Sequence, residues 1–150
     1  MPRLVAGDVV DGRYALSQCI AVQVDGEIWE VLQGRVGRVL SLKSFAWTGT
    51  LDDGARARFL AEARAAARVR HPHVAEVVDA GFDAVGAPYV AMEPLGGELL
   101  ADRLARRGRL SLGRAVGIVL RMLDALDCAH ALGVVHGHLD PTRVFVDRKS

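Results

Sequence analysis

The stretch Val39-Leu40-Ser41-Leu42-Lys43 is an apolar run of strand length that ends in a lysine. Branched aliphatic side chains over about five positions, bounded by turn residues, are typical of a β-strand. Lys43 is conspicuous because the chain has 19 basic residues, and Lys43 and Lys149 are the two lysines among them. The sequence therefore predicts a strand whose last residue is a candidate functional cation.

Two apolar stretches, residues 14–24 and 27–32, precede this run. Gly26 and the segment from Gly34 to Gly37 supply turn residues between the stretches. Together with residues 39–45, the two stretches predict a three-stranded antiparallel meander.

After these strands, the spacing of apolar residues changes to that of a helix. Between Asp52 and Arg70 the apolar positions recur at helical spacing until Pro72 stops the pattern, which predicts a helix with one buried face. Strands are expected again at residues 74–79 and 87–93, around a turn from Gly81 to Gly86.

Helices follow the last of these strands. A short helix is expected over residues 99–107, closed by Gly108. A long helix is expected to begin after the cap residue Ser111 and to run to about Leu132.

The last part of the chain predicts a small β-hairpin. Residues 134–135 and 144–146 have the pattern of two short strands, and they flank a polar loop from His136 to Arg143. Because the strands come first and the helices later, the order of elements indicates an α+β fold.

The composition is that of a globular domain, with 51% hydrophobic residues, 25% charged residues and a formal net charge of +1. A nearly neutral chain carries no electrostatic footprint for nucleic acid or an anionic membrane. Cys19 and Cys128 are too far apart for a disulfide framework or a C-x-x-C metal pair, so both are expected to be buried thiols in a reducing compartment. No apolar run reaches the length of about 20 residues that a membrane-spanning helix needs.

Five motifs, in order along the chain, resemble those of bacterial serine/threonine protein kinases. The run from Val39 to Lys43 resembles the V-A-I-K strand, and Glu62 follows on the next helix, like the glutamate of the kinase αC helix. The other three resemble the turn after αC, the strand that enters the hinge and the catalytic loop H-R-D-L-x-x-x-N. These are His71-Pro72-His73-Val74, Tyr89-Val90-Ala91-Met92-Glu93 and His136-Gly137-His138-Leu139-Asp140-Pro141-Thr142-Arg143.

The resemblance implies a protein kinase-like fold in two parts. Residues 1–93 would be a complete N-lobe, with a five-stranded antiparallel sheet and the αC helix. Residues 94–150 would be the hinge and the first part of a truncated, mainly helical C-lobe that stops before D-F-G.

The resemblance also implies roles for single residues. Lys43 and Glu62 would form an ion pair that ties αC to the sheet. Met92, Glu93 and Leu95 would be hinge residues, with Met92 in the gatekeeper place and backbone groups from Glu93 to Leu95 available to an adenine.

The catalytic loop departs from the kinase pattern at two positions. An active kinase needs an aspartate to accept the substrate proton and an asparagine to hold magnesium. His138 stands at the aspartate position and Arg143 at the asparagine position. Arginine offers only hydrogen-bond donors and cannot ligate a hard cation, and histidine cannot replace the charge of a carboxylate beside a metal-bound phosphate. No catalytic residue is therefore expected.

Two neighbours in this loop have other expected roles. Asp140 is two residues out of register for the catalytic base, so rescue of activity by this carboxylate is not expected. In active kinases the first histidine of the loop is a buried packing residue, and His136 is expected to act in the same way.

The loop that covers the phosphates in kinases is also altered. Of the pattern G-x-G-x-x-G-x-V, the segment Ala21-Val22-Gln23-Val24-Asp25-Gly26-Glu27-Ile28 keeps the third glycine, Gly26. Side chains would fill the rest of the loop, and Asp25 would place a negative charge near any triphosphate. Nucleotide binding is expected to be weak or absent, and no cofactor is expected.

Two other patterns in the sequence bear on ligand binding. The pairs His71/His73 and His136/His138 have a spacing that permits two metal ligands, but no third cluster accompanies them, so no metal site is expected. A basic patch is interpreted as a solvated helix face. It consists of Arg103, Arg106, Arg107 and Arg109.

The long helix has an apolar side that packs against later helices in kinases. Its residues include Val119 and Leu123, which are expected to lie partly uncovered in this chain. Exposed apolar surface of this kind promotes self-association.

These observations favour a catalytically inactive pseudokinase domain that acts as a regulatory protein-binding scaffold. The excess of arginine over lysine is typical of GC-rich coding, as in actinobacteria. Actinobacterial pseudokinases that this chain resembles form the cytoplasmic, intracellular part of membrane proteins, including MviN-like flippases for cell-wall precursors. Some are phosphorylated by an active serine/threonine kinase and bound by forkhead-associated (FHA) domains, which read phosphothreonine.

The resemblance thus implies protein partners of these two kinds and a role in peptidoglycan biosynthesis, while the nearly neutral composition gives no reason to expect a nucleic-acid partner. Two alternatives remain. One is a weak or atypical ATP-binding kinase or switch that uses Lys43 and Glu62, and the other is a fragment without a separate function.

Overall fold

The computed structural model describes residues 4–47 and 49–147. The chain divides into two compact units. The first comprises Met1–Ala67 and Glu76–Pro94, and the second comprises Arg68–Ala75 and Leu95–Ser150.

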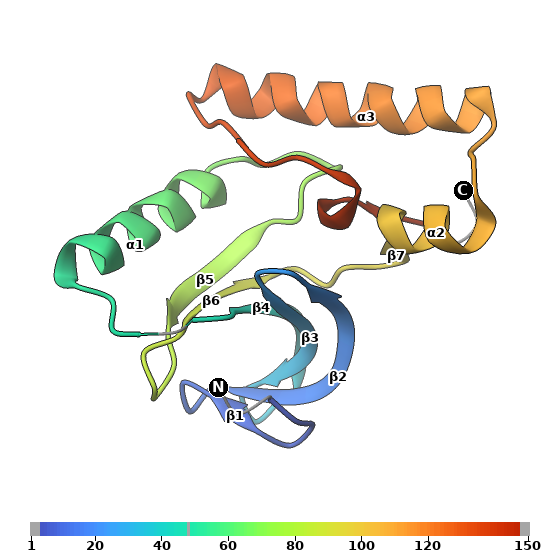
Figure 1. Cartoon of the computed structure of the whole chain (residues 1–150). Coiled ribbons are helices and arrows are strands. Elements are labelled where there is room, and N and C mark those ends of the chain that lie inside the picture. The colour runs from blue at the N-terminus through green and yellow to red at the C-terminus, as the bar shows by residue number, and fades with distance from the viewer. Residues whose placement is uncertain (1–3, 48, 148–150) are drawn as a thin grey trace. The chain divides into compact units, whose positions relative to one another are not determined.

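The first unit is an antiparallel sheet with one helix, α1 (Figure 1). The sheet has the strand order β1-β2-β3-β4-β6-β5. Its strands are β1 (Val9–Val10), β2 (Tyr14–Gln23), β3 (Gly26–Gln33), β4 (Arg38–Phe45), β5 (Val77–Phe82) and β6 (Pro88–Met92), and α1 spans Asp53–Ala67. The expected meander of the first three long strands is confirmed by the pairing of β2 with β3 and of β3 with β4.

The sheet has six strands, so the prediction of five strands was wrong by one. The extra strand is β1, which pairs Val9 with Ala15 and Val10 with Tyr14. A sharp reversal makes this pairing possible, because Asp11 and Gly12 both have positive φ values, of 51° and 62°. Asparagine, aspartate and glycine adopt this left-handed conformation most readily. Two-residue strands carry almost no periodicity, which is why the sequence pattern missed it.

The core of the first unit lies on one face of the sheet. Nine buried side chains from five strands pack into one cluster: Val10, Tyr14, Leu16, Trp29, Val31, Leu40, Leu42, Tyr89 and Ala91. The alternation of these residues along β3 and β4 is the period of two that a half-buried strand requires. The strand that ends in Lys43 is therefore held in the middle of the sheet, between β3 and β6.

Helix α1 begins at a local capping interaction and is joined to the sheet by aromatic contacts. The Asp52 side chain accepts a hydrogen bond of 2.7 Å from the backbone N–H of Ala55, which is a typical N-cap. Phe59 lies between Phe45 and Phe82, with ring centroids 5.7 and 5.4 Å away. The helix ends at Ala67, three residues before the predicted end.

The strand after α1 begins later than predicted. The sequence pattern placed a strand at residues 74–79, whereas β5 spans Val77–Phe82. Val74 lies in a turn instead, because its N–H donates to the carbonyl of His71 at 3.0 Å. The following turn, predicted from Gly81, starts at Asp83, whose carboxylate accepts hydrogen bonds from the N–H groups of Val85 and Ala87.

A polar network joins the two edges of this sheet. The buried Tyr14 donates a hydrogen bond to the carboxylate of Asp79, and Tyr89 donates to Asp11 at 2.6 Å. Arg13 lies between the two carboxylates, 2.6 Å from Asp11 and 3.0 Å from Asp79. Because β1 and β5 are the outermost strands, these contacts show that the sheet curls until its edges meet.

The network shifts the pKa values of its members. The hydrogen bond from Tyr89, and next the one from Arg13, lower the pKa of Asp11 below its usual 3.8. Burial raises the pKa of Tyr14 and of Tyr89. A carboxyl with a lowered folded-state pKa stabilises the fold above its ordinary pKa, and this contribution is lost as the pH falls through the lowered value.

The second unit is mainly helical. Its elements are β7 (Glu98–Leu99), α2 (Leu100–Arg107), α3 (Leu112–Ala131), the 3-10 helix η1 (Pro141–Arg143) and β8 (Phe145–Val146). The predicted N-cap of the long helix is confirmed, because the Ser111 side chain accepts from the N–H of Arg114. After the end of α3, Gly133 has a positive φ of 73°. The segment Arg68–Ala75 belongs to this unit, where His71 contacts Asp124 of α3.

The predicted hairpin at the end of the chain was wrong. Val134 and Val135 form no strand, and β8 pairs with β7, so that Glu98 faces Val146 and Leu99 faces Phe145. Gly97 permits this approach, since a Cβ at this position would lie 2.0 Å from the carbonyl oxygen of Val146. The pairing joins residues more than forty positions apart, which no local pattern reveals.

The apolar side of α3 is partly uncovered, as expected. Val119 and Leu123 expose 50% and 54% of their surface, and Val116 and Leu120 are similarly open.

Candidate functional site

Lys43 is a buried cation in the middle of the sheet. Its residue exposure is 7%, and it faces Ile28 on β3 and Val90 on β6. The ammonium lies 2.9 and 3.0 Å from the two carboxylate oxygens of Asp25, and 4.8 Å from the ring centroid of Phe45. A buried lysine needs such partners, because an isolated charge inside a protein is strongly unfavourable.

The expected ion pair between Lys43 and Glu62 is not formed. Glu62 lies on α1 and is exposed, and it has no hydrogen bond or ion pair with the part of the chain that the structure describes. The carboxylate beside Lys43 comes from the loop between β2 and β3 instead. In protein kinases a lysine–glutamate pair of this kind must be in place for activity.

Asp25 makes a contact that the sequence did not predict. It was expected to act as an unfavourable charge near a triphosphate, not as the partner of Lys43. It occupies the second position of the two-residue loop that joins Gln23 to Gly26. Its own backbone carbonyl accepts a hydrogen bond of 2.9 Å from the N–H of Ala46, just after β4, which holds the loop against that strand.

Gly26 has a packing role that is independent of any nucleotide. It pairs with Phe45 across β3 and β4, and a Cβ at this position would lie 2.1 Å from the carbonyl oxygen of Ser44. Real Cβ atoms do not approach a backbone oxygen this closely. The close contact between the hairpin and β4 therefore requires glycine.

The two histidines of the polar loop lie on the surface of the second unit. His136 and His138 are both exposed, and the ring Nδ1 of His136 accepts a hydrogen bond of 3.3 Å from the backbone N–H of His138. The expectation that His136 is a buried packing residue was wrong for this structure.

The carboxylate nearest the catalytic position is engaged in a turn. Asp140 is the N-cap of η1, where it accepts hydrogen bonds from the N–H of Thr142 at 2.7 Å and from its hydroxyl at 2.5 Å. These hydrogen bonds, with that from the hydroxyl the strongest, lower the pKa of Asp140. A carboxylate stabilised in its charged form is a weaker base, so Asp140 is poorly suited to accept a substrate proton.

Arg143 ends the same 3-10 helix. Its backbone N–H donates to the carbonyl of Asp140 at 3.0 Å, and its side chain is half-buried. Arg143 is the residue expected at the position of the magnesium-binding asparagine, and its guanidinium offers a fixed positive charge.

The three hinge residues fall at the boundary between the two units. Met92 ends β6 and Glu93 follows in the first unit, whereas Leu95 begins a segment of the second. The backbone N–H of Glu93 already donates to the carbonyl of Glu76 at 2.9 Å, and its side chain pairs with Arg38 at 2.7 Å. At Glu93 the backbone donor is therefore used within the sheet.

Metal ligands do not gather in the structure. Within residues 4–47 and 49–147, no group of three histidine, cysteine, aspartate or glutamate side chains is placed to hold an ion. His71 lies 3.0 Å from Asp124 instead, and its Nδ1 accepts from the N–H of His73. Both thiols, Cys19 and Cys128, were expected to be buried, but each is half-buried, and they form no disulfide with each other.

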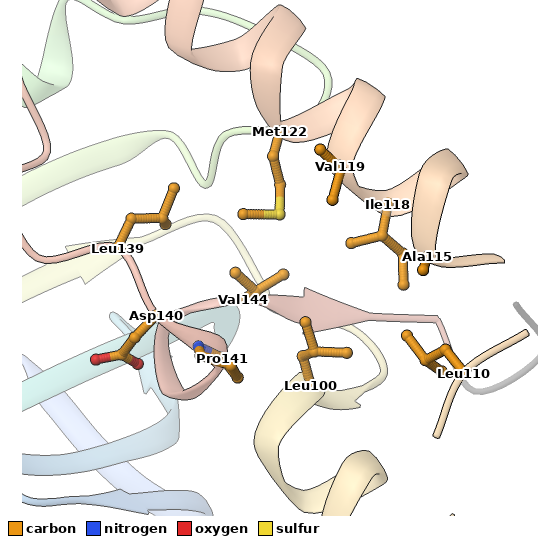
Figure 2. Close-up of a pocket in the computed structure, with 10 residues that line it drawn as sticks. All are labelled: Leu100, Leu110, Ala115, Ile118, Val119, Met122, Leu139, Asp140, Pro141 and Val144. Carbon is orange, nitrogen blue, oxygen red and sulfur yellow. The ribbon is translucent and has the colours of Figure 1, made fainter. Parts of the chain in front are cut away.

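The second unit contains an apolar pocket of about 250 Å³ (Figure 2). Side chains of α3, among them Met122 and Ile118, point towards Val144 and towards Leu100 of α2 in Figure 2. Asp140 is the one charged residue of its lining. A pocket with so few polar groups offers little to orient a small polar substrate.

The expected basic patch is only partly solvated. Arg103 is 1% exposed and donates to the carbonyl of Asp147 at 3.0 Å, and Arg106 pairs with Glu98. Arg107 and Arg109 are exposed, as expected. The helical spacing of Arg103 and Leu100 could have indicated this burial, because residues three apart share one face of a helix.

The chain was compared with family models, with curated proteins and with solved structures. No protein-family model matches it. It is 35% identical over 144 residues to the serine/threonine-protein kinase PknA of Mycobacterium tuberculosis, an alignment that covers 93% of this chain and 33% of that protein. It is 31% identical over 157 residues to a probable serine/threonine-protein kinase, PknB of Bifidobacterium longum, covering 99% of this chain and 22% of that protein.

The structural comparison agrees with the sequence comparison. The crystal structure of the Mycobacterium tuberculosis PknI kinase domain matches with a TM-score of 0.82 and 30% sequence identity. This match covers 97% of the chain and 58% of the PknI kinase domain. The chain thus spans a third or less of these curated relatives and a little over half of that solved domain. Among the described residues, no helix is long and apolar enough to cross a membrane.

Proposed function

We propose that this chain, which has the protein kinase-like fold and is a homologue of bacterial serine/threonine protein kinase domains, is a pseudokinase that acts as a regulatory protein-binding scaffold. The observation that carries the proposal is the replacement of two catalytic-loop positions by His138 and Arg143. The base and the magnesium ligand of kinase catalysis are both missing as residue types.

The surroundings of these positions support the proposal. The carboxylate of Asp140 would be the substitute base, but it accepts two hydrogen bonds from Thr142 within its own turn. His138 is exposed and its backbone N–H donates a hydrogen bond to the ring of His136, and among the described residues no carboxylate is seen to hold its imidazole as a base. Proton acceptance and metal binding, the two tasks of the kinase loop, thus have no suitable side chain.

The nucleotide-binding residues of the first unit support it as well. Lys43 is paired with Asp25, and Glu62 is exposed on α1. A lysine that is neutralised by an internal carboxylate has less to offer a phosphate group, because the ligand must displace a partner that is already in place.

We expect no phosphotransfer from the chain. The measurement is incorporation of labelled phosphate from magnesium-ATP into the chain itself and into a generic protein substrate, with the PknA kinase domain as a positive control. The variant with both His138→Asp and Arg143→Asn is expected to remain inactive, because Lys43 stays paired with Asp25. Phosphotransfer by the unaltered chain above the level of a heat-denatured sample would contradict the proposal and support the alternative of a weak kinase.

The scaffold role is proposed to operate in the cytoplasm, as the intracellular part of a membrane protein in peptidoglycan biosynthesis. Its partners would be an active serine/threonine kinase that phosphorylates it and an FHA-domain protein that reads the phosphothreonine. The uncovered face of α3 supports a role in protein contacts, since its four apolar residues expose 47% to 60% of their surface.

We expect this face to mediate self-association of the chain. Sedimentation velocity should show a weight-average mass that rises with protein concentration, because apposed copies would bury the apolar side chains. Replacing Leu120 and Leu123 by glutamate should leave a monomer at every concentration. A matched control is Arg121→Glu, which changes the charge of the same turn without removing apolar surface. A wild-type chain that stays monomeric would show that α3 does not pair with itself.

A further inference from the structure

Asp25 and Lys43 form a contact that closes the hairpin between β2 and β3 against β4. Both carboxylate oxygens of Asp25 lie within 3.0 Å of the Lys43 ammonium. A lysine ammonium also binds phosphate oxygens, as a compact point charge, so the carboxylate occupies a cation that a phosphate group could otherwise bind. The lysine side chain is 9% exposed and the aspartate side chain 36%, so the carboxylate is the more accessible member of the pair.

The backbone keeps this carboxylate in place. The loop has two residues, Val24 and Asp25, and neither has a positive φ. The carbonyl of Asp25 accepts the N–H of Ala46, and Gly26 lets the loop pack against the backbone of Ser44. A side chain held by its own backbone loses little further entropy when it pairs, so the internal carboxylate competes well against an anion from solution.

We propose that Asp25 is a built-in substitute for phosphate, which occupies Lys43 and closes a latent site for the polyphosphate of a nucleotide. The site opens when the charge of Asp25 is removed. The buried ammonium of Lys43 then lacks the Asp25 carboxylate, and an anion of the phosphate class can bind in its place. This inference rests on the proposed function, because it takes the anion that would bind Lys43 to be a nucleotide, as in the homologous kinase fold.

The test compares the unaltered chain with Asp25→Asn, which keeps the size of the side chain and removes its charge. ATP and adenosine are titrated into each protein by calorimetry, without magnesium. We expect Asp25→Asn to bind ATP about tenfold or more tightly than the unaltered chain, while the affinity for adenosine stays the same. Adenosine lacks phosphate, so an unchanged affinity for adenosine would show that the gain for ATP depends on its phosphates and not on a general opening of the hairpin.

Two further variants assign the gain to the lysine. The double variant Asp25→Asn with Lys43→Gln should lose the gain, because the cation that would hold the phosphate is absent. Asp25→Glu keeps the negative charge and should bind ATP no better than the unaltered chain. A folded Asp25→Asn protein with no gain for ATP, or with an equal gain for adenosine, would overturn the inference.

A second measurement covers the case in which Asp25→Asn does not fold. The chain has two lysines, so acetylation of Lys43 can be read by mass spectrometry with Lys149 as an internal reference. In the unaltered chain, millimolar ATP should leave the ratio of the two acetylation rates unchanged. Specific protection of Lys43 by ATP would show that Asp25 does not close the site, and would overturn the inference.

The outcomes also separate this inference from the proposed function. A gain in ATP binding without phosphotransfer supports both. No gain in a folded Asp25→Asn protein overturns the inference and leaves the pseudokinase proposal standing. Phosphotransfer by the unaltered chain overturns the proposed function, whatever Asp25 does.

Discussion

Replacing Gly26 by alanine is expected to destabilise the first unit by about 3 kcal/mol. The new Cβ would lie 2.1 Å from the Ser44 carbonyl oxygen and 3.0 Å from the Phe45 Cα, and both of these are backbone atoms of β4. Backbone in a paired strand cannot rotate away as a flexible side chain can. Relief therefore requires β3 and β4 to separate at the pair of Gly26 with Phe45.

Urea unfolding followed by tryptophan fluorescence measures this effect. Both tryptophans, Trp29 and Trp47, belong to the first unit, so the signal reports on the unit that carries the change. The matched control is Gly34→Ala, at the next hairpin of the same sheet, where a Cβ would meet nothing within 4 Å. Its positive φ of 69° should cost about 1 kcal/mol.

The difference between the two glycine variants isolates the steric clash. Equal losses of stability would show that the close approach of the hairpin to β4 is not needed for the fold. The result also bears on function, because Gly26 is what the chain keeps of the kinase phosphate loop. If packing alone requires this glycine, its presence says nothing about nucleotide binding.

Replacing Asp79 by alanine is expected to cost about 2–3 kcal/mol. The change leaves the hydroxyl of Tyr14, which is fully buried, without its acceptor in Asp79. It also removes the ion pair with Arg13, which is about half exposed and should contribute little by itself. Most of the loss thus comes from the unsatisfied hydroxyl, since a buried polar group without a partner pays its full desolvation cost.

A double-mutant cycle with Tyr14→Phe tests this cause. Tyr14→Phe removes the hydroxyl, so the loss from Asp79→Ala should shrink by about 1 kcal/mol or more in the phenylalanine background. Fluorescence-detected urea unfolding of the four proteins supplies the energies. Additive losses would mean that the hydrogen bond between Tyr14 and Asp79 does not hold the two edges of the sheet together.

Local sequence signals were sufficient where a short stretch decides its own structure. The long helix was predicted from its apolar period, and its first cap from Ser111, because capping and periodicity act within a few residues. The three long strands before α1 followed from glycine turns and alternation. The kinase resemblance was carried by five short motifs, which the comparisons support at 31% to 35% identity.

Errors arose where distant parts of the chain decide the outcome. Val146 pairs with Glu98, so the predicted hairpin with Val134 and Val135 did not form. Arg103 was placed among solvated arginines, whereas the fold buries it against the carbonyl of Asp147. Burial and strand pairing depend on which segments meet in space, and a window of neighbouring residues does not contain that information.

The candidate site also depends partly on the local sequence and partly on contacts between distant residues. The sequence by itself determined which residue types are present, and the resemblance to kinases places His138 and Arg143 at the positions of the catalytic aspartate and the asparagine. Only the tertiary structure decided which carboxylate serves Lys43. Asp25 and Glu62 are nearly equally far from Lys43 along the chain. The tight hairpin at Gly26 brings the carboxylate of Asp25 within 3.0 Å of the buried ammonium, whereas Glu62 is exposed to solvent.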